Sequence, residues 1–357
     1  MNKIKLAIVT STRPELIRLS EIIKKCSNYF NLLHIYTNQN YDYSLSGQFF
    51  KEFNISPDIV LSNTLKLNGI EFIGWCMKRI FAHLKNKNID MVLVLGDTNG
   101  ALAAVNVAKR LKIPIFHMEA GNRCYDDLNV PEEINRKQID RISDWHLCYT
   151  QRSREQLLLE GYLPNKIIVI GNPIYEVLKK YDKGNETTKK HILVTLHRKE
   201  NIEDEERLKN IFESLSTIKQ KVIVSLHPSL KSKLTDWELD NYVNSLENIS
   251  FFTPTNFQDF IKLEKNAICV ITDSGTIPEE CSILNIPCIL IRHSTERPEL
   301  LENNSMIICS NPKDLDCALN IAINENTENP IHPDYDKPVS NNVIKLLMRY
   351  NDVLPKV

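Results

Sequence analysis

The sequence has almost no net charge, which limits the partners it can attract. Its 357 residues carry 44 lysines and arginines against 45 aspartates and glutamates, a formal net charge of −1. Nucleic-acid and anionic-membrane surfaces favour a strongly basic partner. The balance therefore argues against either of them, although a local basic patch could still face a phosphate.

Long apolar runs and paired cysteines are also missing. No stretch approaches the roughly 18 apolar residues of a membrane span, and the apolar start, residues 4–10, is too short for a signal peptide and has no cleavage site. The nine cysteines form no C-x-x-C pair, as expected of small buried side chains in a reducing compartment. We expect a cytoplasmic protein in which even Cys124, which lies among polar residues, is a spectator thiol.

The common cofactor and nucleophile motifs are absent as well. There is no Walker A loop and no G-x-G-x-x-G segment, which disfavours ATP and NAD. No H-x-x-x-H, H-E-x-x-H or paired-cysteine spacing indicates a metal, and no G-x-S-x-G segment indicates a hydrolase. We expect neither a metal nor another cofactor.

What is present is an alternation of strand-like and helix-like segments in two successive sets. Such alternation is typical of parallel sheets covered by helices on both faces, and the length favours two domains. We expect an α/β protein with two doubly wound, Rossmann-like sheets, a linker at 181–190 and an amphipathic tail helix at 341–350. The expected strands are 4–10, 32–37, 91–95, 113–118, 145–149 and 167–170, then 192–196, 222–226, 268–272, 287–291 and 307–309; the expected helices are 14–26, 101–111, 152–160, 205–218, 256–264, 277–284 and 313–324.

Polar side chains cluster after the strands of the first set, where open α/β sheets bind ligands. Arg13 stands at the start of a helix, a natural phosphate site, although helix capping by Ser11 or Thr12 with a solvated Arg13 explains it too. Asp97 follows a strand and could be a simple N-cap. The segments 117–123 and 130–136 bring further carboxylates and arginines, which form either a catalytic group or a structural ion-pair network.

The second set shows the same placement with different residue types. Two successive strands end in His197 and His227, which packing alone explains poorly. Residues 273–280 form a strand, a turn of small residues and a helix, whose backbone N–H groups can hold a pyrophosphate while an acidic residue takes ribose hydroxyls. Another charged cluster, residues 295–299, follows.

Taken in order, the segments TRPE, GDT, HMEAGNR, PEEINR, LHRKEN, HP, DSGTIPEE and TERPE resemble the non-hydrolysing UDP-N-acetylglucosamine 2-epimerase family over about residues 4–325. The resemblance implies a glycosyltransferase-B-like fold, a homodimer and no metal or redox cofactor. It also implies a first domain of residues 1–171, joined by a C-terminal helix at 339–352, and a UDP-binding domain of residues 172–338.

The resemblance further implies a mechanism, in which UDP is eliminated across C1–C2 to leave a 2-acetamidoglucal and then added back with protonation on the other face. In the family's pattern Asp97, Glu119 and Glu132 are the acid and base candidates, and His197 and Arg13 stabilise the departing pyrophosphate. The other implied substrate-binding residues are Arg18, Arg123, Arg136, His227, Phe260 (near the uracil), Ser274, Gly275, Thr276, Glu280 and Arg297.

Several positions depart from the family's usual pattern. Ser11 replaces a glycine, Arg18 a common lysine, and Thr276 the second glycine of the phosphate turn. Residues 39–42 read QNYD where many members have Gln-His, which puts regulation by a second sugar in doubt.

The substrate therefore stays open. The expected reaction is of the UDP-N-acetylglucosamine to UDP-N-acetylmannosamine type, for surface polysaccharide synthesis. The NQNYDY, HMEAGNRC and DSGT versions are similar to a branch that converts UDP-2-acetamido-2,6-dideoxy-talose to UDP-N-acetylfucosamine. A UDP-sugar glycosyltransferase shares the implied fold and remains an alternative. A hydrolysing epimerase is a second alternative, and a non-enzymatic nucleotide-sugar sensor is a more remote third.

Overall fold

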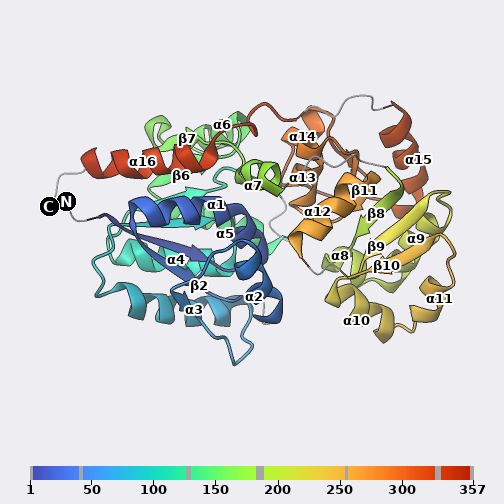
Figure 1. Ribbon diagram of the computed structural model, residues 1–357, viewed down its shortest axis with the longest axis horizontal. Helices are drawn as coiled ribbons and strands as arrows, with labels where there is room; N and C mark the ends of the chain where they lie inside the picture. The colour runs from blue at the N-terminus through green and yellow to red at the C-terminus, as the bar shows by residue number, and fades with distance from the viewer. Residues whose placement is uncertain are drawn as a thin grey trace. The chain divides into compact units, whose positions relative to one another are not determined.

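The computed structural model describes residues 3–39, 43–125, 130–181, 189–253, 256–325 and 331–353. The chain divides into two compact units: unit 1 comprises Met1–Val177 with Asp334–Val357, and unit 2 comprises Leu178–Pro333 (Figure 1). The domain boundaries drawn from the sequence stay a prediction. Most of the expected linker, residues 182–188, lies outside the described residues, as do residues 40–42 of the QNYD segment.

Unit 1 is built on a seven-stranded parallel sheet with the order β3-β2-β1-β4-β5-β6-β7. Its central strands are apolar on both faces, as expected for a sheet covered by helices on each side; all five residues of β4 are buried. In the register, Val9 of β1 lies opposite Ile35 of β2 and Val94 of β4. The strands are β1 Lys5–Thr10, β2 Asn31–Tyr36, β3 Ile59–Val60, β4 Met91–Leu95, β5 Ile115–Met118, β6 Trp145–Cys148 and β7 Ile167–Val169.

The C-terminal helix α16 (Val339–Val353) belongs to unit 1 and packs against α1 (Arg13–Tyr29), as Figure 1 shows in red and blue. Lys25 Nζ donates a hydrogen bond of 2.7 Å to Ser340 Oγ across this contact. The ring of Tyr350 meets the ring of Trp145 edge-on. The remaining helices of unit 1 are α2 Tyr43–Glu52, α3 Gly69–Leu84, α4 Asn99–Arg110, α5 Pro131–Ile142, α6 Gln151–Leu159, the 3-10 turn η1 Pro164–Lys166 and α7 Pro173–Tyr181, which runs into unit 2.

Unit 2 repeats the design with six parallel strands in the order β10-β9-β8-β11-β12-β13. Its strands are β8 His191–Thr195, β9 Lys221–Ser225, β10 Ile249–Phe252, β11 Ala267–Thr272, β12 Cys288–Leu290 and β13 Ile307–Ile308. Its helical segments are α8 Lys199–Ile202, α9 Glu205–Ser216, α10 Pro228–Asp236, α11 Asp240–Asn244, α12 Phe257–Lys265, α13 Ile277–Leu284, α14 Glu299–Glu302, η2 Pro312–Asp314, α15 Leu315–Asn320 and the π-helical η3 Ile321–Glu325.

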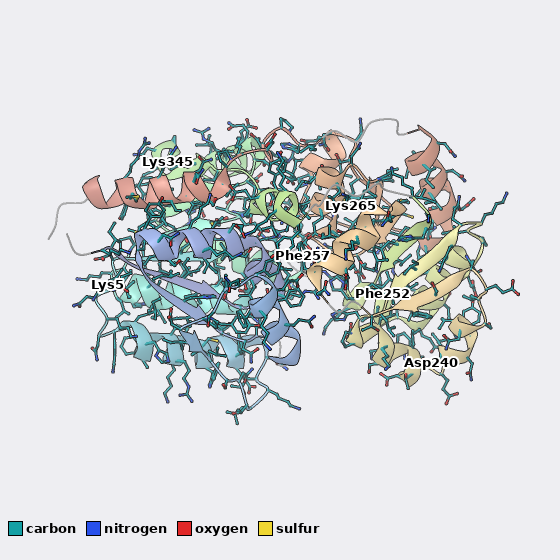
Figure 2. All side chains as sticks on the ribbon, in the orientation of Figure 1. Lys5, Asp240, Phe252, Phe257, Lys265 and Lys345 are labelled. Atoms are coloured by element: carbon teal, nitrogen blue, oxygen red, sulfur yellow. The ribbon has the colours of Figure 1, made fainter. Side chains whose placement is uncertain are left out.

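The side chains between each sheet and its helices form that unit's own apolar core (Figure 2). The predicted fold class, two doubly wound parallel sheets in an α/β protein, is confirmed. The prediction of one continuous α-helix at 313–324 is wrong, because the structure divides this segment into 3-10, α and π helical turns. Leu315, Leu319 and Ala322 are buried while Ile321 is 40% exposed, so most of the predicted apolar face is kept although the hydrogen bonding changes.

Within the described ranges, no helix combines the length and the apolarity needed to cross a bilayer.

Candidate functional site

Unit 1 gathers carboxylates at the carboxyl ends of β4 and β5. Asp97 follows β4 by two residues, and Arg136 on α5 donates to its Oδ2 through Nε at 3.0 Å and through Nη2. Burial raises the pKa of Asp97; Arg136 lowers it, while the charges of Glu119 and Glu132 raise it again. The structure therefore places all three predicted acid and base candidates within electrostatic reach of one another.

Glu119 is held in an unusual backbone conformation directly after β5. Its φ of +70° lies in the left-handed region that few non-glycine residues adopt. Arg18 Nη1 lies 3.3 Å from its Oε2, and the Tyr149 hydroxyl donates to the same oxygen at 3.4 Å. The side chain of Glu119 remains 12% exposed, so the strained turn presents a partly accessible carboxylate beside an arginine.

Arg123, another predicted substrate-binding residue, lies in a buried ion-pair network. Its Nη1 is 2.8 Å from Asp140 Oδ2 and its Nη2 is 2.7 Å from Glu160 Oε2, and the guanidinium is only 1% exposed. Asp140 also contacts His117 Nδ1 at 2.8 Å, and His117 Nε2 contacts the Gly96 carbonyl at 2.9 Å. This network connects α5 with the loops that follow β4 and β5.

Glu133, next to Glu132, is completely buried and accepts hydrogen bonds from the backbone N–H groups of Cys124 and Tyr125. It also contacts Arg136 Nη1 at 2.6 Å. Burial favours a raised pKa for Glu133, but the Cys124 hydrogen bonds and Arg136 bring it below its ordinary value. Arg136 therefore bridges an ionised structural carboxylate and the candidate Asp97.

The N-terminus of α1 contains a carboxylate to which the sequence analysis gave no role. Glu15 Oε2 accepts from the backbone N–H groups of Ser11 and Thr12 at 2.6 and 2.7 Å, and Glu15 Oε1 accepts from Thr98 Oγ1 at 2.9 Å. Burial raises the pKa of Glu15 to about 7 against these hydrogen bonds. The guanidinium of Arg13 lies over the ring of Phe49, 5.3 Å from its centroid.

In unit 2 a second carboxylate missed by the sequence analysis organises the end of β11. Asp273 is fully buried and accepts from the backbone N–H groups of His197 and Arg198 and from Asn201 Nδ2. His197 Nδ1 lies 3.0 Å from Asp273 Oδ1. Burial raises the pKa of Asp273, but His197 and these donors bring it below its ordinary value, so the carboxylate orients the His197 ring.

The predicted phosphate turn follows Asp273 directly. Ser274 Oγ accepts from the Thr276 backbone N–H at 3.2 Å, which tightens the turn. A Cβ atom added at Gly275 would lie 3.4 Å from Glu296 Oε2 and 3.6 Å from Arg198 Nη2, so charged side chains border the turn closely. Glu280 is buried on the first turns of α13.

Three further predicted residues also lie in unit 2. His227 caps α10, with its ring centroid 5.6 Å from that of His197. Phe260 is half-buried on α12. Arg297 is buried, and its Nε donates to Glu279.

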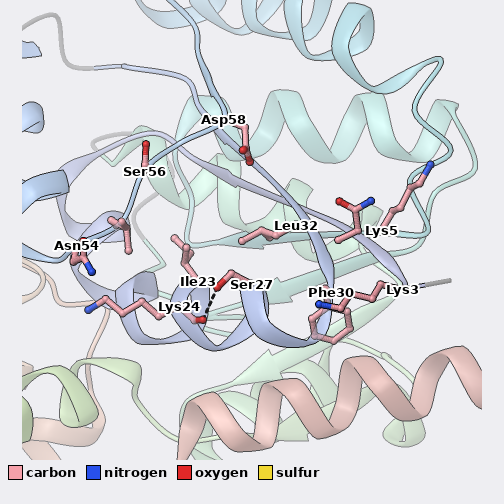
Figure 3. Close-up of a pocket in the computed structure, with 12 residues that line it drawn as sticks. Lys3, Lys5, Ile23, Lys24, Ser27, Phe30, Leu32, Asn54, Ser56 and Asp58 are labelled. Atoms are coloured by element: carbon pink, nitrogen blue, oxygen red, sulfur yellow. Dashed lines mark hydrogen bonds between the residues drawn. The ribbon is translucent and has the colours of Figure 1, made fainter. Parts of the chain in front are cut away.

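A cavity of about 730 Å³ lies elsewhere in unit 1, at the amino ends of β1 and β2 (Figure 3). None of the predicted site residues lines it. Two of its lysines, Lys3 and Lys5, donate to backbone carbonyls, and Lys24 contacts Glu21 at 2.8 Å. Its cations thus have partners, and it is separate from the candidate site.

Comparison with known proteins identifies the family. The family model described as UDP-N-acetylglucosamine 2-epimerase matches residues 24–348. The UDP-N-acetylglucosamine 2-epimerase of Methanocaldococcus jannaschii is 38% identical over 91% of this chain and 94% of its own length. The chain belongs to the UDP-N-acetylglucosamine 2-epimerase family. It is therefore an epimerase, which is an isomerase.

Other members of the epimerase family show the range of relatives. A Pseudomonas aeruginosa UDP-2,3-diacetamido-2,3-dideoxy-D-glucuronate 2-epimerase is 29% identical over 87% of this chain and 90% of its own. The crystal structure of the M. jannaschii UDP-GlcNAc 2-epimerase in complex with UDP-GlcNAc and UDP matches with a TM-score of 0.87 at 36% identity, covering 97% of this epimerase and all of that chain.

A lipopolysaccharide outer core galactosyltransferase in its apo form shares only the fold, with a TM-score of 0.57 at 14% identity over 97% of this chain and 100% of that one. The expected glycosyltransferase-B-like fold is confirmed.

Proposed function

We propose that this epimerase inverts C2 of a UDP-N-acetyl amino sugar, of the UDP-N-acetylglucosamine to UDP-N-acetylmannosamine type, for surface polysaccharide synthesis. The observation that supports this proposal most is the group formed by Asp97, Glu119 and Glu132 after β4 and β5, in which the pKa of Asp97 is raised. The crystallised M. jannaschii relative with UDP-GlcNAc and UDP is consistent with such a substrate.

The chemistry requires what this group supplies. The C2–H bond of the sugar is not activated by a carbonyl, so we propose elimination of UDP to a 2-acetamidoglucal and re-addition with protonation on the opposite face. Such a reaction needs one carboxylate as base and a protonated carboxyl as acid. Because burial and neighbouring carboxylates raise the pKa of Asp97, the group can hold a proton that an isolated aspartate would lose.

For the departing UDP we propose the residues after β8 and β11. His197, whose Nδ1 lies 3.0 Å from Asp273 Oδ1, would donate to the pyrophosphate as it leaves, and Arg13 would add a cation. The turn of Ser274, Gly275 and Thr276 lies at the start of α13, and the positive end of the helix dipole there favours a phosphate.

For the rest of the nucleotide sugar we propose Glu280 at the ribose, Phe260 at the uracil, and His227 and Arg297 in support. In unit 1, Arg18 and Arg136 would hold the carboxylates toward the sugar, and Arg123 would act through its ion pairs with Asp140 and Glu160.

The experiment is to incubate the protein with UDP-N-acetylglucosamine in D2O and to follow the products by NMR. We expect the C2 epimer with deuterium at C2, and UDP with the unsaturated glucal when turnover is slow. Product that keeps its original hydrogen, with no glucal from variants of the three carboxylates, would overturn the mechanism and favour glycosyl transfer, which would in turn require an acceptor.

A panel of three UDP sugars in the same assay tests which of them is the substrate. UDP-N-acetylglucosamine, UDP-2-acetamido-2,6-dideoxy-talose and a UDP-2,3-diacetamido glucuronate differ in the configuration and the substituents of the sugar ring, C2 included, while sharing the UDP that unit 2 would bind. The substrate with the highest kcat/KM identifies the branch, and conversion of the 6-deoxy sugar alone would favour the N-acetylfucosamine alternative.

We also propose a homodimer that uses the outer face of α3. Ile70, Ile73, Met77 and Phe81 follow one another at helical spacing, with Ile70 80% and Phe81 44% exposed and the other two half-buried. Exposed apolar stripes of this kind are typical of association surfaces. Phe81→Asp should give a monomer by light scattering, whereas Leu159→Asp, at an exposed leucine on α6, should not; an unchanged mass for Phe81→Asp would contradict the proposal.

For location we propose the cytoplasm, because all nine cysteines are free thiols, the state that a reducing compartment maintains. Fractionation of the native cells would test it.

A further inference from the structure

Unit 2 contains a buried glutamate that the proposed reaction does not use. Glu264 lies one residue before Lys265, at the end of α12 marked in Figure 2, and its side chain is completely buried. Neither of its carboxyl oxygens meets a hydrogen-bond donor in the part of unit 2 that the structure describes. A buried carboxylate with no donor and no cation is among the costliest groups a protein can contain.

The nearest polar group to Glu264 is another carboxyl. Glu280 on α13 lies within hydrogen-bonding distance of it. Two ionised carboxylates only accept hydrogen bonds, so this contact requires a proton on one of them. We assign the proton to Glu264. Burial, and to a lesser extent the charge of Glu280, raise the pKa of Glu264 well above its ordinary value.

The other titratable neighbours reinforce this assignment. Cys288 on β12 adds to the raised pKa of Glu264, and Cys281 on α13 interacts with both carboxyls. Cys269 on β11 interacts in turn with Cys288. On β8, His191 Nε2 contacts the Leu263 carbonyl, and burial lowers the pKa of His191. Among the groups that shift the pKa of Glu264 there is no cation.

We propose that Glu264 is a positioning residue for nucleotide binding: its protonated carboxyl group donates a hydrogen bond to Glu280 and fixes the carboxylate that receives the ribose hydroxyls of UDP. This inference rests on the proposed function, which assigns the ribose to Glu280. A carboxylate locked by one donor keeps its remaining lone pairs for the two ribose hydroxyls, and a locked rotamer lowers the entropy cost of binding.

The test compares the binding of UDP and of 2′,3′-dideoxy-UDP by calorimetry in the intact protein. Glu264→Leu removes the donor but fills the volume, so UDP should bind about threefold to tenfold more weakly, while 2′,3′-dideoxy-UDP binds as to the wild type. In turnover, the KM for the UDP sugar should rise and kcat should change little.

Glu264→Gln separates a hydrogen-bonding role from packing. Its amide donates to Glu280 at every pH, so the preference for UDP over the dideoxy nucleotide should match the wild type at pH 7 and persist at pH 9. In the wild type the preference should fall as pH rises, because ionised Glu264 repels Glu280. Glu213→Gln, at an exposed position on α9, is the matched control and should change nothing.

Three results would overturn the proposal: an unchanged nucleotide preference in Glu264→Leu, an equal loss for both nucleotides, or a Glu264→Gln profile that falls with pH like the wild type. A wild-type protein that binds no UDP would instead overturn the proposed function together with this inference. UDP binding without any change in ribose preference would leave the epimerase proposal intact.

Discussion

At the carboxyl end of β4 in unit 1, Asp97 is paired with Arg136, while Arg18 lies beside the nearby Glu119. At the carboxyl end of β11 in unit 2, Asp273 is instead enclosed by backbone N–H groups and followed by a turn of small residues. The two sheets have the same kind of strand order, with the chain reversing direction across the sheet beside β1 and β8.

The difference shows how one architecture supports two kinds of chemistry. Carboxylates packed near one another and near arginines have shifted pKa values, which suits proton transfer. A small-residue turn at a helix N-terminus exposes N–H groups, which suits a phosphate that must be held without being protonated. The comparison predicts that variants of the unit 1 carboxylates lose turnover while keeping UDP affinity, and that a variant of His197 in unit 2 loses both.

The largest expected effect is in unit 1. Asp97→Asn should lower kcat about 10³-fold, because an amide cannot exchange the proton that the reaction requires. The UDP dissociation constant, measured by calorimetry, should stay within about twofold, since the proposed nucleotide residues other than Arg13 are in unit 2. A normal kcat would remove Asp97 from the acid and base candidates, and a large loss of UDP affinity would break the division between the two edges.

In unit 2, His197→Ala should lower kcat about 10²-fold and also weaken UDP binding, because the imidazole held by Asp273 no longer faces the pyrophosphate. Steady-state kinetics together with calorimetry measure both effects. Near-normal turnover would show that the leaving group is stabilised elsewhere. Arg13→Ala in unit 1 tests the other cation proposed for the departing UDP, and removing this exposed side chain should have little effect on stability.

Two glycines, one near the carboxyl edge of each sheet, allow the same comparison to be made for the stability of the protein. A Cβ atom at Gly100 on α4 would lie 2.1 Å from Ser11 Oγ and 2.5 Å from Thr37 Oγ1, whereas one at Gly275 meets nothing closer than 3.4 Å. Gly100→Ala should therefore destabilise the protein by about 1–3 kcal/mol in thermal or urea unfolding, and Gly275→Ala by less than about 0.5 kcal/mol. Ser11→Gly combined with Gly100→Ala should recover part of the loss; an additive double variant would exclude this clash as the cause.

These contacts also show what the sequence could predict. The buried strand Met91–Leu95 and the helix Ile277–Leu284 were predicted to the residue, because their apolar patterns are dictated by burial against helices or a sheet. The helix α3 was missed, since Ile70 and Phe81 are apolar but exposed and blur its period.

The polar site was harder to predict than the fold. Candidate residues could be located because they follow strands, and Asp97, Glu119 and Glu132 do lie near one another. The roles of Glu15 and Asp273 could not be predicted, because each depends on N–H groups and hydroxyls that only the folded loops bring together. The position of Asp273 at a strand end, directly before a turn of small residues, is the one signal in the sequence that could have marked it as a candidate.

The smallest expected effect is on the pH dependence of the free energy of unfolding. It compares the buried carboxyl group of Glu15 in unit 1 with that of Glu264 in unit 2. Glu15 in unit 1 accepts several hydrogen bonds, and burial raises its pKa to about 7 from an ordinary 4.5. The unfolded chain loses this proton near pH 4.5 and the folded chain near pH 7, so the free energy of unfolding should fall as pH rises between these values. Over pH 5.5 to 6.5 the fall due to Glu15 should be about 1 kcal/mol.

Glu15→Gln supplies the reference, because its oxygen can accept from Ser11 and Thr12 while its amide donates to Thr98, and it does not titrate. Urea unfolding at both pH values should therefore show the variant gaining about 1 kcal/mol relative to the wild type. Glu264→Gln in unit 2 should gain in the same direction as pH rises, since burial and the charge of Glu280 raise the pKa of Glu264 and no donor within the described part of unit 2 opposes them. A difference between Glu15→Gln and the wild type that is constant with pH would mean that Glu15 is ionised throughout, and that the N–H groups of the α1 turn outweigh its burial.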